Sequence, residues 1–399
     1  MPFRTLNDVL LKYKNVGPGF DLMRFVLAFV ILYGHCWYIA AGAGGTYYLS
    51  RNLGSNAAVA PVIPSLPSAD SASRLWEILH TIRLTLVLNH SDSHFYDVLV
   101  PMFFALSGFL VTGSAFRTKS IRPFLTFRIL RIVPALLTEV SLSALLLGPL
   151  LTVFPLSKYF ADEKFFVYFG NIFGFVQFKL PGLFLHNPVP EIVNLNLWTL
   201  PPEFYCYLII AGLIVSRVLF DRFVFSALFV ISSISLIAAN LLLFYDENIH
   251  NNLIIVYYFF VGSMMYHWRE YIPYSPWLLG VSLAATYFHF LSADGYMLIF
   301  PFFVTYVIIF LGLTKLPRLR LIQSGDYSYG IYLYGFPIAQ ALVTTVPKLQ
   351  GHGIWLASTA IPLTIAFAAV SWHGIEKRML ALKKHFDLKS DAGVGSKTP

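Results

Sequence analysis

Long apolar runs recur along this 399-residue chain, and each holds about 16 to 23 residues with few charges. A helix needs about 20 apolar residues to cross the hydrocarbon core of a bilayer. Of all residues 57% are hydrophobic and only 12% are charged, whereas soluble domains carry roughly 25% charged residues. The sequence lacks the alternating segments of a membrane β-barrel. The runs therefore predict an all-α fold, a polytopic bundle of helices embedded in a lipid bilayer.

The positive charges indicate how such a bundle is oriented. Lys and Arg are enriched in the cytoplasmic loops of membrane proteins. If the N-terminus is cytoplasmic, 21 of the 28 Lys and Arg residues fall on the inner side. We therefore expect about ten transmembrane helices, with both termini in the cytoplasm. The predicted spans are residues 20–40, 98–116, 132–154, 196–217, 223–244, 252–268, 276–292, 295–314, 328–346 and 354–374.

The same pattern divides the chain into three parts. Residues 1–19 form a polar cytoplasmic segment, residues 20–376 form the membrane domain, and residues 377–399 form a polar cytoplasmic tail. The first apolar run is too long for a signal peptide and carries two ionisable residues, which favours a retained helix. The outer segment 155–195 contains an apolar stretch, Phe165 to Phe178, that is too short to span and is expected to be interfacial or re-entrant.

Two ionisable residues, Arg24 and His35, interrupt the first apolar run. Ionisable groups inside a membrane span are costly and usually mark a pathway or a reaction site. Both side chains leave the same face of a helix, about 16 Å apart along its axis. A neutral imidazole can deprotonate a hydroxyl and later return the proton. The alternative for His35 is a packing role, with a hydrogen bond to a neighbouring helix.

A cluster of cations follows the second apolar run. Arginine forks match phosphate oxygens, so the cluster suits a phosphorylated cytoplasmic cofactor such as coenzyme A. The alternative is that the cluster enforces membrane topology and binds anionic lipid. The cations are Arg117, Lys119, Arg122, Arg128 and Arg131.

Two further spans contain residues that suit a reaction site. Ser107, Gly108 and Gly113 are small enough for a narrow acyl-pantetheine channel, although such residues more often serve close helix packing. Glu203 follows two prolines near the predicted outer end of the fourth span. There it would orient His35, hold an acceptor hydroxyl or cap a polar pocket.

Other classes of site find little support in the sequence. His90, Asp92, His94 and Asp97 match no strong metal motif, so no metal site is expected. The phosphate-binding glycine loop and the zinc-protease helix motif are missing from the sequence. The net charge of +8 is concentrated in the inner loops, as membrane topology requires, and no nucleic-acid partner is expected.

Five motifs occur in order between residues 20 and 376. Together they resemble the acyltransferase-3 family of integral-membrane acyltransferases, and the resemblance covers nearly the whole chain. The motifs are Arg24 and His35 with ten residues between them, FFALSGFL at 103–110, FRILRIVP at 127–134, LWTLPPEF at 197–204 and YSYGIYLY at 327–334.

The resemblance implies a bacterial inner-membrane enzyme that moves an acyl group, often acetyl, from cytoplasmic acyl-CoA to an extracytoplasmic acceptor. Family acceptors are hydroxyls of glycans such as lipopolysaccharide O-antigen, exopolysaccharide or peptidoglycan. Acetyl-CoA would be a co-substrate, with no tightly bound cofactor. The family's Arg and His map onto Arg24 and His35, and its arginines after the second span map onto Arg128 and Arg131. The chain departs from the family at residues 335–337, which are Gly-Phe-Pro where many members have a His.

The resulting hypothesis gives each candidate residue a role. Arg24 and the cation cluster hold the phosphates of acyl-CoA, and the thioester extends to His35. His35 takes the proton of the acceptor hydroxyl, or carries the acyl group transiently. Glu203 is the third catalytic candidate, and Trp198 and Tyr332 are the substrate-binding candidates. The donor-binding candidates are Ser107, Arg117, Arg122, Arg128 and Arg131.

Two other functions remain as alternatives. The chain would be a transporter or flippase for a glycan or a small anion, with Arg24 and His35 as a substrate or proton site. Otherwise it would be an assembly subunit of a polysaccharide-export complex, and such a subunit would tolerate the loss of His35.

Overall fold

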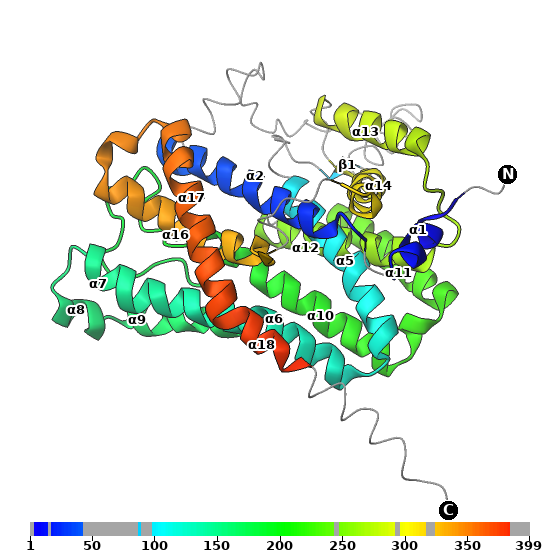
Figure 1. Cartoon of the computed structure of the whole chain (residues 1–399), viewed down its shortest axis with the longest axis horizontal. Helices are drawn as coiled ribbons and strands as arrows, with labels where there is room; N and C mark the ends of the chain where they lie inside the picture. The colour runs from blue at the N-terminus through cyan, green and yellow to red at the C-terminus, as the bar shows by residue number, and fades with distance from the viewer. Residues whose placement is uncertain are drawn as a thin grey trace, which may run out of the picture.

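The computed structural model describes residues 4–14, 17–42, 87–88, 98–242, 247–291, 296–316 and 324–383. Their regular secondary structure is helical, apart from a two-residue antiparallel ladder between β1 (Val87–Leu88) and β2 (Tyr296–Met297). The all-α prediction is therefore confirmed (Figure 1). The α-helices are α1 (Leu6–Lys12), α2 (Phe20–Ala41), α5 (Leu99–Thr118), α6 (Ile121–Leu142), α7 (Gly148–Leu151), α8 (Leu156–Ala161), α9 (Glu163–Tyr168), α10 (Leu200–Val215), α11 (Arg222–Leu242), α12 (Glu247–His267), α13 (Pro276–Leu291), α14 (Phe300–Leu313), α16 (Ser328–Thr345), α17 (Gly353–Ser371) and α18 (Lys377–Ala381).

A helix lies at each of the ten predicted spans. Among the described residues, five helical stretches are both long and apolar enough to cross a membrane by themselves. The other helices at predicted spans are shorter or less apolar, so the number of crossings and the side of the termini stay predictions. The five stretches are Phe20–Ala41, Leu99–Thr118, Ile121–Leu151, Leu195–Val215 and Gly353–Ala381.

The segment before the first span folds onto the bundle. Asp8 and Thr5 form a reciprocal capping box that starts α1. The backbone amide of Leu6 donates to the carbonyl oxygen of Ile272 at 3.0 Å, and Leu6 and Val9 are buried. The polar segment therefore carries an amphipathic helix that packs against α14.

Glycines bring α5 and α12 into close contact. A Cβ atom at Gly108 would lie 1.8 Å from the carbonyl oxygen of Phe259, and one at Gly262 would lie 2.0 Å from that of Ala105. Side chains at these positions would force the two helices apart. Of the two interpretations of Gly108, close helix packing is therefore the one that the structure supports.

The described segment between α7 and the 3-10 turn at Leu195 contains no helix long enough to span a membrane. A π-helical turn, Ser143–Leu147, ends α6, and the hydroxyl of Tyr159 donates to the carbonyl oxygen of Ala144 inside it at 2.7 Å. The segment continues as the short helices α8 and α9, which lie with α7 at one end of the molecule in Figure 1. It then returns to α16, where the side-chain amide of Asn187 donates to the side-chain oxygen of Gln340 at 2.8 Å.

Candidate active site

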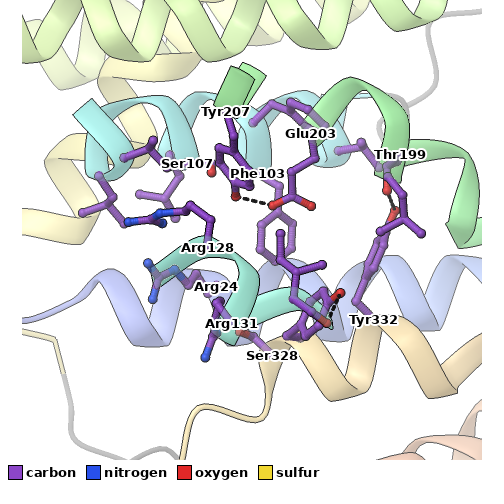
Figure 2. A pocket seen from close by; sticks show the side chains of 18 residues that line it. Arg24, Phe103, Ser107, Arg128, Arg131, Thr199, Glu203, Tyr207, Ser328 and Tyr332 are labelled. Carbon is purple, nitrogen blue, oxygen red and sulfur yellow. Dashed lines mark hydrogen bonds between the residues drawn. The ribbon is translucent and has the colours of Figure 1, made fainter. Parts of the chain in front are cut away.

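A cavity lies between α2, α5, α6, α10 and α16, and polar side chains are grouped within its mainly apolar lining. Figure 2 shows three arginine side chains gathered at one end of this cavity and Tyr332 with Thr199 at the other, with Phe103 and Glu203 between them. The remaining wall is largely apolar. The polar lining residues are Arg24, Ser107, Arg128, Arg131, Thr199, Glu203, Tyr207, Ser328, Tyr329 and Tyr332.

The helical phase of α6 divides the cation cluster in two. Arg128 and Arg131 are three residues apart and therefore share one face, which lines the cavity. Arg122 lies half a turn out of phase with Arg131 and is exposed, as is Arg117 at the end of α5. The structure therefore brings Arg128 and Arg131 into the candidate site but leaves Arg117 and Arg122 at the surface.

Asp326 joins two of the three cavity arginines. Its Oδ2 atom lies 2.6 Å from an amino nitrogen of Arg131 and 3.5 Å from one of Arg24. The hydroxyl of Ser328 donates to Oδ1 at 2.6 Å. Burial alone would raise the pKa of the Asp326 carboxyl, but Arg131 and Arg24 outweigh burial and hold that pKa well below its usual range.

Arg128 differs from the other two because it forms no ion pair among the described residues. Its guanidinium carbon lies 5.7 Å from the ring centre of Tyr207 and 5.7 Å from that of Phe124. Its Nε atom is buried and has no hydrogen-bond partner within the described part of the chain. A half-buried guanidinium with an unpartnered Nε atom and no ion pair is a suitable site for an anionic ligand.

Glu203 lines the same cavity as the arginines. It lies in the first turn of α10, which directly follows the 3-10 turn Leu195–Thr199. The side-chain amide of Asn194 donates to the carbonyl oxygen of Leu333 on α16 at 2.9 Å and anchors this turn. The hydroxyl of Tyr207, one helical turn after Glu203, donates to the Oε1 atom of Glu203 at 2.5 Å.

Tyr332 forms the other end of the cavity. Its hydroxyl lies 3.0 Å from that of Thr199, and the side-chain amide of Asn196 donates to its carbonyl oxygen at 2.5 Å. The second substrate-binding candidate, Trp198, is partly buried against the main apolar core and does not line the cavity. The structure thus places only Tyr332 of these two beside the arginines.

His35 is not among the residues that line this cavity. Its ring packs edge-on against Phe336 of α16, with the ring centres 5.4 Å apart. The Nδ1 atom is buried and has no hydrogen-bond partner among the described residues. The hydrogen bond to a neighbouring helix, which the packing interpretation of His35 supposed, is therefore missing at this nitrogen in the described part of the chain.

Six of the ten candidate residues come together in the cavity. They are Arg24, Ser107, Arg128, Arg131, Glu203 and Tyr332. Sequence reasoning missed Asp326 and Tyr207. Tyr207 follows Glu203 by four residues, a spacing that places the two side chains side by side on a helix. Asp326 stands directly before the YSYG motif, and this position could have identified it as a candidate. His90, Asp92, His94 and Asp97 lie outside the described residues, which contain no group of three or more potential metal ligands.

Comparison with known proteins gives the family. Residues 18–373 match the family model described as an acyltransferase domain. An O-acetyl transferase of Shigella phage Sf6 is 28% identical over 291 residues, which cover 71% of this chain and 84% of the relative. Nodulation protein 10 of Rhizobium leguminosarum bv. viciae is 25% identical over 313 residues, covering 71% of this chain and 82% of the relative. No solved structure matches the chain.

The family model covers the chain from α2 to α17 and every residue that lines the cavity. The resemblance inferred from the five motifs is therefore confirmed. Together with its long apolar helices, this match shows that the chain belongs to the acyltransferase-3 family of membrane acyltransferases.

Proposed function

We propose that this protein transfers an acetyl group from cytoplasmic acetyl-CoA to a hydroxyl of an extracytoplasmic glycan, in a bacterial inner membrane. The observation that carries the proposal is the cavity in which Arg128, half-buried and without an ion pair among the described residues, lies beside Arg24 and Arg131. The O-acetyl transferase among the relatives supports acetyl as the group and oxygen as the acceptor atom.

The arginine end of the cavity is the proposed donor site. Coenzyme A carries several phosphate groups, and arginine forks bind phosphate oxygens with charge-assisted hydrogen bonds. Arg128 would be the first ligand, because the guanidinium groups of Arg24 and Arg131 already share Asp326. Ser107 lines the same cavity, beside Arg128, and is a proposed contact of the pantetheine arm. Acetyl-CoA acts as a co-substrate here and leaves as free coenzyme A.

His35 is the proposed general base. It lies about 16 Å beyond Arg24 along α2, at the distance that an extended acyl-pantetheine arm has to span. The acceptor hydroxyl gives its proton to His35 while its oxygen attacks the thioester carbonyl. The carbon–sulfur bond then breaks, and the thiolate of coenzyme A takes the proton. In the second route His35 itself attacks and carries the acetyl group before the acceptor does.

Glu203 and Tyr332 are proposed to orient the reacting groups. Glu203 faces the cavity with one carboxylate oxygen bound to Tyr207, which leaves its other oxygen for a ligand. The Tyr332 hydroxyl is already oriented by Thr199. Both residues therefore present a fixed polar group between the arginine end and the region of His35.

The test is acetyl transfer in membrane vesicles supplied with radiolabelled acetyl-CoA. A general base contributes about 10²- to 10⁴-fold to a rate, so His35→Ala should lose incorporation into glycan by about that factor. His352→Ala is the matched control, because His352 is exposed directly before α17 and does not line the cavity. Near-normal incorporation with His35→Ala would contradict the role of this imidazole.

The acceptor is identified by mass spectrometry of glycans from cells with and without the protein. Loss of acetyl esters from one polysaccharide in the deletion strain would name it. A transporter predicts a different result, namely solute accumulation in vesicles without any acyl-CoA. If glycan acetylation is unchanged in the deletion strain, the proposed enzyme function is wrong.

A further inference from the structure

The donor cavity and His35 contact successive turns of α16, and each does so through an aromatic side chain. Tyr332 lines the cavity, whereas Phe336, one helical turn further along, packs against the ring of His35. His35 itself does not reach the cavity. In this arrangement of side chains the cavity therefore does not extend to the imidazole.

The aromatic partner of Tyr332 is Phe103 of α5. The two rings lie 6.3 Å apart between centres, at a tilt of 56°. Tyr332 is held in place at both ends, because its hydroxyl contacts Thr199 and its carbonyl oxygen accepts a hydrogen bond from Asn196. The described structure shows no hydrogen bond that holds the Phe103 ring, since phenylalanine has no polar atom to form one. Phe103 is therefore the ring of the pair that is easier to displace.

Phe103 also lies on the boundary between the two apolar clusters of the bundle. The larger cluster includes the apolar residues that line the cavity, and the smaller one contains Phe336, whose ring packs against His35. Among the described residues, Phe103 is the one partly buried side chain that packs against both clusters. Its ring thus lines the cavity between the arginines and Tyr332 (Figure 2) and also packs against the cluster that contains Phe336, the partner of His35.

We propose that the Phe103 ring is the bottleneck on the path from the donor cavity to His35, and that its size restricts transfer to small acyl groups. This inference rests on the proposed donor and on His35 as the reaction site. The acyl group is the leading end of the pantetheine arm, so it is the first part of the donor that has to pass the Phe103 ring. A smaller side chain at position 103 widens the path and admits longer acyl groups.

The path itself is tested without any acyl donor. In a protein whose two native cysteines, Cys36 and Cys206, are replaced by Ala, His35→Cys supplies one thiol at the end of the path. A negatively charged, membrane-impermeant methanethiosulfonate reagent is applied to vesicles of each orientation. From the side of the arginines, Phe103→Ala should raise the labelling rate about tenfold or more, because the removed ring leaves a cavity.

Two further variants make the labelling result specific. Phe103→Leu should give an intermediate rate, and it covers the case in which the alanine variant folds poorly. Leu110→Ala enlarges the same cavity seven residues further along α5, towards Arg117, and should leave the labelling rate at its starting value. An equal labelling rate for all three side chains at position 103 overturns the bottleneck.

Acyl selectivity is tested with an equimolar mixture of acetyl-CoA and butyryl-CoA in vesicles that contain the native acceptor. The measured quantity is the ratio of butyryl to acetyl esters released from glycan by mild base. Each buried methylene is worth about fourfold in a binding constant, so two methylenes should raise this ratio about fifteenfold in Phe103→Ala. A loss of folded protein would lower both esters together and leave their ratio unchanged.

The outcomes separate the inference from the proposed function. Wild-type protein that forms neither ester overturns the proposed function and with it the acyl selectivity, while the labelling rates still decide the bottleneck. Wild-type protein that forms acetyl esters, together with an unchanged ratio in Phe103→Ala, overturns the selectivity alone. A raised ratio in Phe103→Ala, an intermediate one in Phe103→Leu and a wild-type ratio in Leu110→Ala support it.

Discussion

Arg24 and His35 lie on the same helix and the same face, yet their surroundings differ in kind. Arg24 is partly exposed and contacts two carboxylates, Asp21 at 3.3 Å and Asp326 at 3.5 Å. His35 packs against Phe336, and its Nδ1 atom has no partner among the described residues. One end of the proposed path is therefore a preformed charged site, and the other is an apolar one.

This difference matches the two tasks that acyl transfer requires. Phosphate groups need fixed cations, and the ion pairs with Asp326 hold two of the three arginines in place before any ligand arrives. A thioester has to be kept from water until its acceptor arrives, and apolar surroundings exclude water. The charged end would therefore bind the donor, while the apolar end would direct the acyl group to the glycan hydroxyl.

The largest effect on the charged end is expected from Arg128→Ala. Hydrogen bonds to charged groups contribute about 1.5 to 3 kcal/mol, so the KM for acetyl-CoA should rise about 10- to 100-fold. Arg128→Lys keeps the charge but loses the planar fork, so its KM for acetyl-CoA should lie between those of wild type and Arg128→Ala. The measurement is the dependence of the initial transfer rate on acetyl-CoA concentration. An unchanged KM in Arg128→Ala would remove this residue from the donor site.

Asp326→Asn is expected to lower stability. Breaking a buried ion pair costs about 3 to 5 kcal/mol, and the partial exposure of this pair, 22% for Arg131 and 19% for Asp326, reduces the expected loss to about 2 kcal/mol. Glu191→Gln is the control, because Glu191 pairs with Lys179 at the surface and such pairs contribute about 0 to 1 kcal/mol. Thermal unfolding in detergent measures both variants, and equal midpoints would contradict the structural role of Asp326.

The same carboxylate predicts a pH dependence of a definite sign. The pKa of Asp326 is depressed in the folded protein, so its contribution to stability is complete above its unfolded pKa of about 3.9. That contribution is lost only as the pH falls through the depressed folded value. The difference in unfolding midpoint between wild type and Asp326→Asn should therefore stay constant from about pH 5 to pH 8 and shrink below about pH 4. A difference that widens on acidification would reverse this interpretation.

The smallest effect is expected at the exposed cations. Arg117 and Arg122 lie outside the cavity, where solvent and salt screen their charges. Arg117→Ala and Arg122→Ala should each leave the KM for acetyl-CoA within about twofold of wild type, because exposed charges contribute little to an interaction. A tenfold increase in either variant would extend the donor site from the cavity to the surface.

Local patterns were sufficient for much of the helical architecture. Helix α2 ends one residue beyond its predicted span, because apolar composition and helical periodicity are properties of neighbouring residues. The division of the cation cluster was within reach as well, since a phase difference of half a turn separates Arg122 from Arg131. The pairing of Arg131 with Asp326 was not, because 195 residues separate the two in sequence.

The sequence by itself determined that this chain is a helical membrane protein of the acyltransferase-3 family, and it named Arg24, Arg128, Arg131 and Glu203 as candidates. Tertiary structure alone decided that these side chains share one cavity, that Asp326 links two of them, and that Phe103 packs against both apolar clusters. The physical reason is range. The apolar composition of a segment determines whether that segment forms a membrane helix. The contacts between helices depend instead on how the five helices around the cavity pack together.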